Sequence, residues 1–156
     1  MPLALATLSP IWHNKLPCRC SLGRKRIEVG ITIENVKNDQ FAILLGIEIV
    51  EVRIGYALLK LCIEEKHLNG IGMVQGGALF TLADYAFGVA ANADGSTAVG
   101  INASISYFKT PKGKTIYAEA MEESTNKKIC GYKVLIKDED GSLVASFSGL
   151  GYRKDK

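Results

Sequence analysis

The stretch GGALFTLADYAFGVAAN, residues 76–92, decides the fold of this 156-residue chain. Alanine and leucine are good helix formers, and they make up much of the stretch. Apolar side chains fall on nearly every face of the helix that it would form, which is typical of a helix buried inside a protein. Its seventeen residues would span roughly 25 Å as a helix. We therefore predict one long helix enclosed by the rest of the chain.

The sequence before this helix predicts a short helix and a hairpin. Apolar positions over 34–45 indicate a helix that ends at Gly46. Alternating apolar residues then predict two strands, over 47–54 and 56–64, joined by a tight turn. Residues 66–75 contain asparagine and glycine at turn positions, so we expect a loop leading into the long helix.

The sequence after the long helix returns to strand patterns. In 98–108, polar residues alternate with an apolar set on the other face, namely Ile101, Ala103, Ile105 and Tyr107. Three further strands are expected over 115–123, 129–137 and 143–152. Strands joined by short turns pair antiparallel. The predicted class is α+β, with an antiparallel sheet of five to six strands wrapped around one long central helix.

Length and composition suit a single globular domain. The chain is 47% hydrophobic and 22% charged, which is ordinary for a folded protein of one domain. No apolar run approaches the roughly 18 residues of a membrane span, so no membrane association is expected. The net charge of +3 is too small to indicate a nucleic-acid-binding protein.

The first residues differ from the rest in charge. Residues 1–27 carry five basic side chains and no acid, whereas the remainder has 14 basic and 16 acidic groups. A secretory signal would place its charges before the apolar stretch, not after it, and an organelle transit peptide is an alternative. We predict that residues 1–30 are an N-terminal extension, disordered or non-native through a start codon assigned too early. Residues 31–156 are then expected to form a single domain.

The cysteines do not suggest a metal site or a disulfide scaffold. The chain has four, at 18, 20, 62 and 130, and it contains neither a C-x-x-C nor an H-E-x-x-H pattern. No metal site is expected. Cys62 and Cys130 lie in apolar segments, where a buried, inert thiol is the ordinary interpretation. This usage favours a reducing, cytoplasmic location.

Asp84 is the candidate for chemistry on the long helix. It is the only formally charged side chain between Lys66 and Asp94. One interpretation places it on a solvent-facing stripe of the helix or in a local cap. The other makes it a general base or nucleophile whose surroundings tune its pKa.

The helix begins with Gln75-Gly76-Gly77, which is the second candidate feature. A helix N-terminus presents free N–H groups and a partial positive charge, and glycine allows a ligand to approach closely. Such a terminus can stabilise an oxyanion. The alternative interpretation is a tight entry from loop to helix without a role in binding.

Several of these segments together resemble a known family. His67-Leu-Asn69, Val74-Gln-Gly-Gly77 and the run from Ala78 to Asp84 are similar to the PaaI-like branch of hotdog-fold thioesterases, and the resemblance covers about residues 36–152. It implies a hotdog fold and hydrolysis of an acyl-CoA thioester to a carboxylic acid and coenzyme A. No cofactor is implied, because coenzyme A is part of the substrate.

The resemblance also implies catalytic roles. Asp84 matches the family's general base or nucleophile, Gly76 matches the glycine whose N–H polarises the thioester carbonyl, and Asn69 matches a polar side chain that positions substrate or water. Gln75 stands where the family usually has histidine. A glutamine amide donates a hydrogen bond but transfers no proton at neutral pH, so we expect a positioning role at this residue.

Four further positions are assigned to substrate binding. Gly77 belongs to the same helix entry, and Asn102 matches a polar position on the strand after the helix. The phosphates of coenzyme A call for basic side chains at the mouth of the groove. Lys109 and Lys128 are chosen from a larger set of basic residues near turns, which are Lys109, Lys112, Lys114, Lys127, Lys128 and Arg153.

Helix geometry predicts that the site needs two chains. Gly76 and Asp84 are eight residues apart, so they lie about 12 Å apart along one helix axis. One thioester carbonyl cannot contact both within about 3 Å. Two antiparallel helices would bring Gly76 of one chain near Asp84 of the other, which predicts a dimer with two equivalent sites. The resemblance implies the same, with a homodimer as minimal unit and a homotetramer expected.

An alternative function on the same fold is a non-catalytic acyl-CoA-binding or sensing module.

Overall fold

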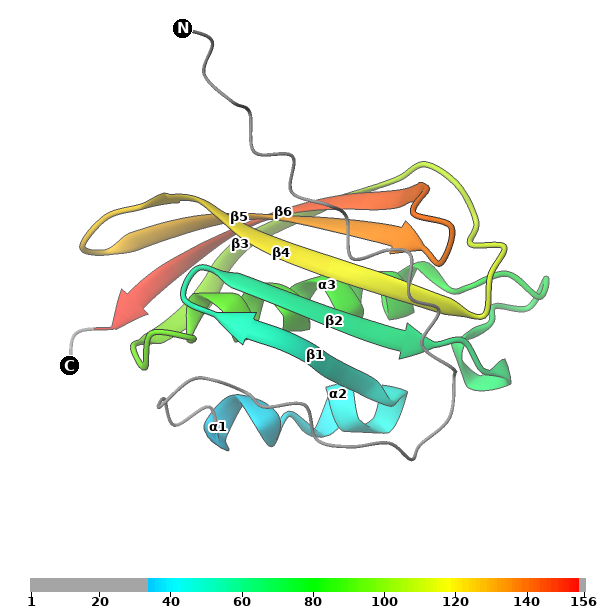
Figure 1. The fold of residues 1–156 in the computed structure, drawn as a ribbon, viewed down its shortest axis with the longest axis horizontal. Coiled ribbons are helices and arrows are strands. Elements are labelled where there is room, and N and C mark those ends of the chain that lie inside the picture. Colours follow the sequence, from blue (N-terminus) through cyan, green and yellow to red (C-terminus); the bar gives the residue numbers. More distant parts are fainter. Residues whose placement is uncertain (1–33, 155–156) are drawn as a thin grey trace, which may run out of the picture.

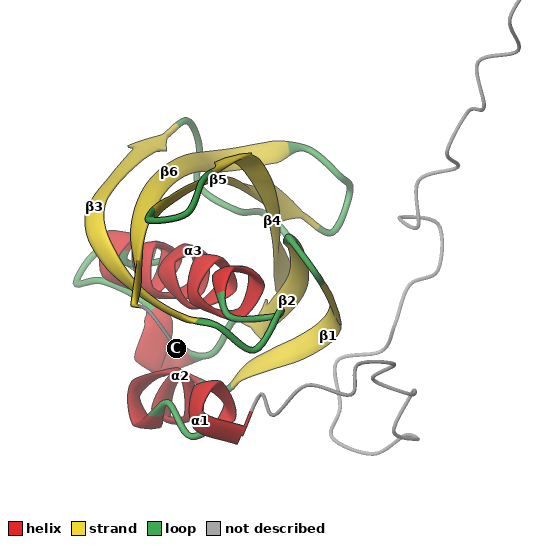
Figure 2. Cartoon of the chain, turned by 90° about the vertical axis from the view of Figure 1, so that its left-hand side faces the viewer, coloured by secondary structure: helices red, strands yellow, loops and turns green. Residues whose placement is uncertain are grey.

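The computed structural model describes residues 34–154, so the extension predicted for residues 1–30 lies outside the described residues. An antiparallel sheet of six strands curls around one long helix (Figures 1 and 2). The strand order across the sheet is β1-β2-β4-β5-β6-β3. The strands are β1 (Ile47–Arg53), β2 (Tyr56–Cys62), β3 (Thr97–Tyr107), β4 (Thr115–Thr125), β5 (Ile129–Asp138) and β6 (Leu143–Lys154). The helices are α1 (Glu34–Lys37), α2 (Gln40–Leu45) and α3 (Gly76–Ala91), with a 3₁₀ turn, η2, over Glu65–His67. This confirms the predicted α+β class and the hotdog arrangement.

Helix α3 is the buried helix that its sequence predicted. Ten of its side chains are buried against the concave face of the sheet, and they are Ala78, Leu79, Leu82, Ala83, Tyr85, Ala86, Phe87, Val89, Ala90 and Ala91. One stripe stays at least partly exposed, and it consists of Gly77, Thr81, Asp84 and Gly88. These four residues share one face because they recur every three or four positions. The solvent-facing stripe considered for Asp84 therefore exists in the single chain.

Aromatic side chains join α3 to the centre of the sheet. The Phe87 ring packs against Tyr132 on β5 and Phe147 on β6, with ring centroids 5.5 and 6.2 Å apart. Phe80, two turns earlier on α3, makes an edge contact with Phe147 at 5.5 Å. Such pairs bury large apolar areas in tilted or edge geometries. They fix the rotation of α3, and hence the direction in which its exposed stripe points.

The helix predicted over 34–45 is in fact two helices. Asp39 interrupts it, because its Oδ1 accepts hydrogen bonds from the backbone N–H groups of Phe41 and Ala42, at 3.0 and 2.8 Å. An aspartate in this position caps a new helix, and its own backbone is extended. The predicted end at Gly46 is confirmed, since this residue has a left-handed φ of 74°.

Strand β3 differs from the half-buried strand that its alternation predicted. It lies at one edge of the sheet and pairs only with β6 among the described strands. An irregularity between Gly100 and Asn102 shifts the pairing register. Ile101 is 55% exposed and Tyr107 is 50% exposed. Of the apolar residues expected on one face of this strand, Ile101, Ala103 and Tyr107 are thus exposed in the single chain, whereas Ile105 is partly buried and packs against the core.

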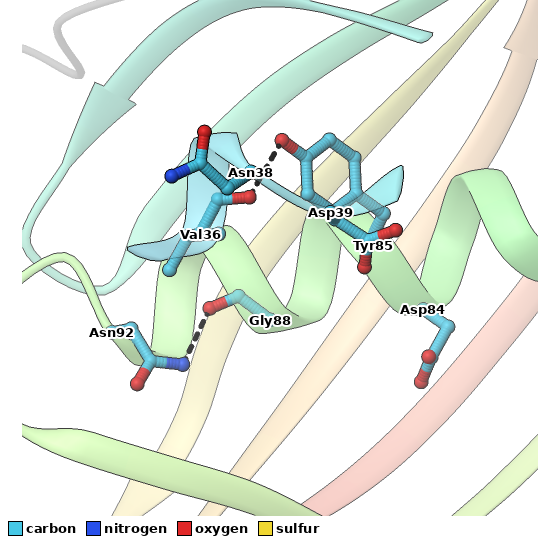
Figure 3. A pocket seen from close by; sticks show the side chains of 7 residues that line it. All are labelled: Val36, Asn38, Asp39, Asp84, Tyr85, Gly88 and Asn92. Atoms are coloured by element: carbon cyan, nitrogen blue, oxygen red, sulfur yellow. Dashed lines mark hydrogen bonds between the residues drawn. The ribbon is translucent and has the colours of Figure 1, made fainter. Parts of the chain in front are cut away.

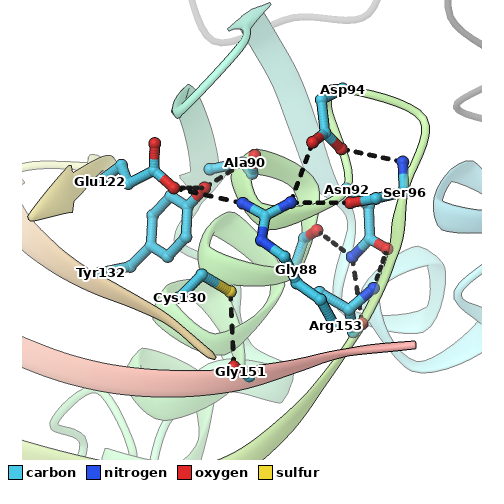
Figure 4. Close-up of polar contacts among 11 residues, drawn as sticks. Gly88, Ala90, Asn92, Asp94, Ser96, Glu122, Cys130, Tyr132, Gly151 and Arg153 are labelled. Atoms are coloured by element: carbon cyan, nitrogen blue, oxygen red, sulfur yellow. Dashed lines mark hydrogen bonds and ion pairs between the residues drawn. The ribbon is translucent and has the colours of Figure 1, made fainter. Parts of the chain in front are cut away.

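The far end of α3 is tied to the sheet by Arg153 on β6 (Figure 4). Its guanidinium donates hydrogen bonds to Asp94 at 2.9 Å, to Ser96 at 2.8 Å and to Glu122 at 3.2 Å. The Tyr132 hydroxyl donates to the same Glu122 carboxylate at 3.3 Å. The loop that follows α3 is thus held to β4 and β6, so the C-terminal end of the helix is fixed.

The cysteines follow the expectation at only one of two positions. Cys130 is a buried, free thiol, as predicted. Cys62 is half-buried and disulfide-bonded, so it is not the inert thiol that was expected. Within residues 34–154, no helix is long and apolar enough to cross a membrane. The cytoplasmic location stays a prediction.

Candidate active site

Asp84 lies in the middle of α3 and borders two cavities. The first, of about 280 Å³, lies between α3 and the α1–α2 segment, where Asn38 and Asp39 contribute to its wall (Figure 3). The second, of about 420 Å³, lies between α3 and β3. Asp84 is therefore the side chain at which both cavities meet. Of the described residues that line them, only Asp39 and Asp84 carry a formal charge.

The environment of Asp84 favours its protonated form. Partial burial on the flank of α3 raises the pKa of this carboxyl above its usual value, and the nearby Asp39 carboxylate raises it further. Both causes disfavour the charged form, one by removing water and the other by repulsion. A carboxylate with a raised pKa holds a proton more tightly, which makes it a stronger base once it is ionised.

Gly76 opens α3 and presents a free donor. Within residues 34–154, its backbone N–H has no hydrogen-bond acceptor, as expected for the first residue of a helix. The Tyr107 hydroxyl donates to the carbonyl oxygen of Gly76 at 3.0 Å, and a Cβ at Gly76 would lie 3.3 Å from that phenol ring. Glycine is favoured here because the tyrosine ring packs so closely against the backbone.

Gln75 has a structural task that the sequence interpretation did not foresee. Its side-chain oxygen N-caps α3, accepting hydrogen bonds from Gly77 N–H and, at 3.2 Å, from Ala78 N–H. The amide group thus points back at the helix terminus. Since the Gly77 N–H is already occupied in this conformation, Gly76 is left as the available donor. The substrate-binding roles of Gln75 and Gly77 stay predictions.

Asn69 shapes the loop before α3. Its Oδ1 accepts hydrogen bonds from the N–H groups of Ile71 and Met73, at 3.1 and 3.0 Å. This arrangement closes a tight loop, which is a common use of asparagine. Its side-chain NH₂ group makes no hydrogen bond within the described residues. The catalytic positioning role of Asn69 is a prediction that depends on this group.

His67, which begins the H-x-N pattern, is buried and structural. Its Nδ1 accepts a hydrogen bond from Glu64 N–H at 2.9 Å, and its Nε2 lies 2.8 Å from the carbonyl oxygen of Leu45. A single neutral tautomer with its proton on Nε2 satisfies both contacts. His67 therefore joins the end of α2 to the loop that precedes α3, away from the cavities.

The remaining predicted residues lie at three places, one beside Asp84 and one at each end of α3. Asn102 lines the second cavity together with Asp84, so the structure brings these two residues together. Lys109 follows β3 beyond Tyr107, at the Gly76 end of α3, and donates a hydrogen bond to Ser142. Lys128 lies in the β4–β5 turn, with its ammonium 5.6 Å from the Tyr152 ring centroid. Its carbonyl accepts from Arg153 N–H, which places it at the opposite end of α3.

Asp39 is the residue of this site that the sequence interpretation missed. The stretch 34–45 was interpreted as one helix, and an aspartate inside a helix suggests only a solvated side chain. The pair Asn38-Asp39 before an apolar run is, however, the usual pattern of an N-cap. That signal would have placed a helix start, though not a carboxylate, beside the cavity of Asp84.

The fold and this site together define a class of protein. A curled antiparallel sheet around one long helix is the arrangement of the hotdog fold, and this chain adds a lone carboxylate on that helix and a free N–H at its start. The family model of the thioesterase superfamily matches residues 71–145. The acyl-coenzyme A thioesterase PaaI of Escherichia coli is 33% identical over 118 residues, which cover 75% of this chain and 84% of PaaI.

Two further comparisons agree with this result. A protein of Archaeoglobus fulgidus is 36% identical over 118 residues, covering 75% of this chain and 77% of the relative. The solved structure of the E. coli PaaI protein from the phenylacetic acid degradation operon superposes with a TM-score of 0.74 and 31% identity, over 78% of this chain and 89% of that one. The chain belongs to the PaaI-like branch of the thioesterase superfamily, and it is a thioester hydrolase.

Proposed function

We propose that this protein hydrolyses acyl-CoA thioesters, with Asp84 as general base or nucleophile and the Gly76 N–H as oxyanion donor. The observation that carries the proposal is the pairing of a carboxylate with a free N–H at the start of the same helix. The carboxylate borders two cavities, and no described residue that lines them is a cation. The name of the PaaI relative, an acyl-coenzyme A thioesterase, supports the class of substrate.

The proposed reaction needs one base and one donor. Water attacks the thioester carbonyl carbon while the Asp84 carboxylate takes a proton from that water. Negative charge moves onto the carbonyl oxygen, where the Gly76 N–H stabilises it. The tetrahedral intermediate then collapses and the C–S bond breaks. The departing thiolate takes up the proton that Asp84 had accepted, so the products are a carboxylic acid and the thiol of coenzyme A. With Asp84 as nucleophile, its carboxylate attacks the carbonyl carbon, the C–S bond breaks and coenzyme A leaves as the thiolate. Water then hydrolyses the resulting enzyme-bound anhydride to the carboxylic acid and the Asp84 carboxylate.

We propose that two chains share each active site. Gly76 and Asp84 lie eight residues apart on one continuous helix, which separates them by about 12 Å. The exposed α3 stripe and the exposed Ile101 of β3 lie on either side of the second cavity, and we propose that a second copy of the chain covers them. A two-fold dimer would place Gly76 of one chain near Asp84 of the other and produce two equivalent sites. A homotetramer made of two such dimers stays a proposal of the same kind.

The positions of the two lysines fit this dimer better than a single chain. Lys109 and Lys128 lie at opposite ends of α3. In an antiparallel pair of helices, the end of one chain that carries Lys109 and Gly76 lies beside the end of the other chain that carries Lys128. We propose that both lysines contact the phosphates of coenzyme A at that shared end.

An activity panel tests the function. We expect the purified protein to release free thiol from at least one member of a set of acyl-CoAs with short, long and aryl acyl groups. The release is followed with a thiol-reactive dye. If acyl-CoA binds, as measured by calorimetry, but no member of the panel is hydrolysed, the protein is instead a non-catalytic acyl-CoA-binding or sensing module. The panel also identifies the acyl group that the site prefers.

A mixed-dimer experiment tests the shared site. A chain with Asp84→Asn and a chain with Gly76→Pro, which lacks the donor N–H, should each be nearly inactive alone. In a mixed dimer, one site combines the intact Gly76 of the first chain with the intact Asp84 of the second. Random mixing should therefore restore roughly a quarter of wild-type activity. Co-expression with two affinity tags isolates the mixed species, which should have roughly half of wild-type activity because one of its two sites is intact. Activity no higher than that of the separate variants would contradict the shared site.

A further inference from the structure

Asp39 places a second carboxylate on the wall of the first cavity. Its Oδ1 is held by the N–H groups of Phe41 and Ala42, at 3.0 and 2.8 Å, where it caps α2. Asp39 is exposed, but these two hydrogen bonds restrict the rotation of its side chain. The cap therefore keeps a negative charge at one place beside α3 (Figure 3).

The segment that carries Asp39 is also tied to α3. The Tyr85 hydroxyl donates a hydrogen bond to the carbonyl oxygen of Val36 at 3.1 Å, and the Asp39 N–H donates to the same oxygen at 3.3 Å. Tyr85 directly follows Asp84 on α3. One carbonyl oxygen thus joins the two segments, so the position of Asp39 relative to Asp84 is set by the fold.

The charged side chain that lines the cavities together with Asp84 is also negative. On the side of the α1–α2 segment Asp84 shares the first cavity with the Asp39 carboxylate, and Tyr85 is the other titratable side chain that lines this cavity. From β3 it faces the four residues Gly100, Ile101, Asn102 and Ala103, none of which titrates. The described residues of the two cavities provide no cation to offset the two carboxylates.

We propose that Asp39 is a positioning residue of the active site, whose fixed charge acts on Asp84 and sets the pH range in which Asp84 works as a base. The proposal rests on the proposed function, in which Asp84 accepts a proton from water. In its support, the pKa values of both Asp84 and Tyr85 are raised, by burial first and by the Asp39 charge second. Two neighbouring groups on α3 therefore respond to the same carboxylate.

The sign of the effect follows from repulsion. With Asp39 present, Asp84 keeps its proton up to a higher pH, so base-dependent activity is lost earlier as the pH falls. Asp39→Asn removes the charge and keeps the N-cap, since asparagine caps helices as well as aspartate. We expect the pKa of Asp84 to fall in this variant. The acid limb of the pH–rate profile should then move to lower pH, while the plateau rate stays within about tenfold of wild type because the base remains.

The test measures the carboxyl group directly and the reaction separately. The ¹³C carboxyl resonance of Asp84, assigned by its loss in Asp84→Asn, is titrated by NMR in wild type and in Asp39→Asn. A titration midpoint that moves to lower pH supports the proposal. Raising the ionic strength should shrink the difference between the two proteins, because the Debye length falls from about 10 Å at 0.1 M to about 3 Å at 1 M.

A matched control separates this effect from a general change in charge. Glu123→Gln removes one carboxylate from an exposed position on β4, outside the two cavities, and should leave the Asp84 midpoint unchanged. An unchanged midpoint in Asp39→Asn, with thermal unfolding like that of wild type, overturns the proposal. Failure of the proposed function has a different signature, since Asp84→Asn would then hydrolyse thioesters as fast as wild type, whatever the NMR titration gives.

Discussion

Replacing Asp84 with asparagine should lower kcat by about 100- to 10,000-fold, the contribution typical of a positioned general base. The amide has nearly the same size and shape as the carboxyl but cannot accept a proton from water or attack a thioester. Because Asp84 lies on the exposed stripe of α3, the substitution should not disturb the core. Thiol release from the best acyl-CoA of the panel measures the loss.

Two further measurements identify the cause of that loss. Binding of a non-hydrolysable thioether analogue of the substrate should change by less than the rate does, because Asp84 acts on the water or the carbonyl carbon and not on coenzyme A. Thermal unfolding should be equal or slightly raised, since a partly desolvated carboxylate beside Asp39 has been neutralised. The exposed-surface variant Glu123→Gln is the matched control and should keep full activity. An Asp84→Asn enzyme within tenfold of wild type would contradict the role of this residue as base or nucleophile.

Replacing Gly76 with proline should lower kcat by about 100- to 1,000-fold, the usual cost of losing one oxyanion donor. Proline has no N–H, yet it is favoured at the first residue of a helix, where the missing hydrogen bond has no partner in the helix. The preceding residue, Gln75, already has extended backbone angles of −69° and 134°, which a following proline requires. The substitution thus removes the donor and preserves the helix start.

The control for this variant is Gly76→Ala, which keeps the N–H. Both alanine and proline place a Cβ about 3.3 Å from the Tyr107 ring, so both cause the same local adjustment. Activity of the alanine variant should stay well above that of the proline variant, with KM changed in both to a similar degree. Equal losses in the two variants would show that crowding against Tyr107, and not the missing donor, lowers the rate.

Much of the fold could be predicted because its signals are local. The apolar character of residues 76–92 predicted the buried helix, and alternation with short turns predicted the strand positions to within a few residues. Those patterns depend on neighbours within a few positions of one another, which is the range over which a sequence directly expresses helix and strand periodicity. The isolation of Asp84 among uncharged residues was visible in the same way.

The secondary-structure prediction was wrong in two situations. In one, a side chain replaces the regular hydrogen bonds of a helix, and in the other, a strand lies at the edge of the sheet. At Asp39 the carboxylate bonds to backbone N–H groups and starts a new helix, which periodicity alone does not reveal. Along β3 the alternation is present, but the strand lies at the sheet edge and the apolar side chains of Ile101 and Tyr107 stay exposed. Alternation predicts that a face will be covered, and it does not say whether the cover belongs to the same chain.

The sequence by itself determined the buried helix, the antiparallel strands around it and the lone carboxylate of Asp84, because each follows from local residue order. Only the tertiary structure decided which groups surround that carboxylate. Asp39 reaches the same cavity wall from a segment 45 residues earlier, and Asn102 reaches the second cavity from β3. The physical reason is that the energy of a charge depends on distance in space, which is set when the aromatic contacts of Phe87 and Phe147 fix α3 against the sheet.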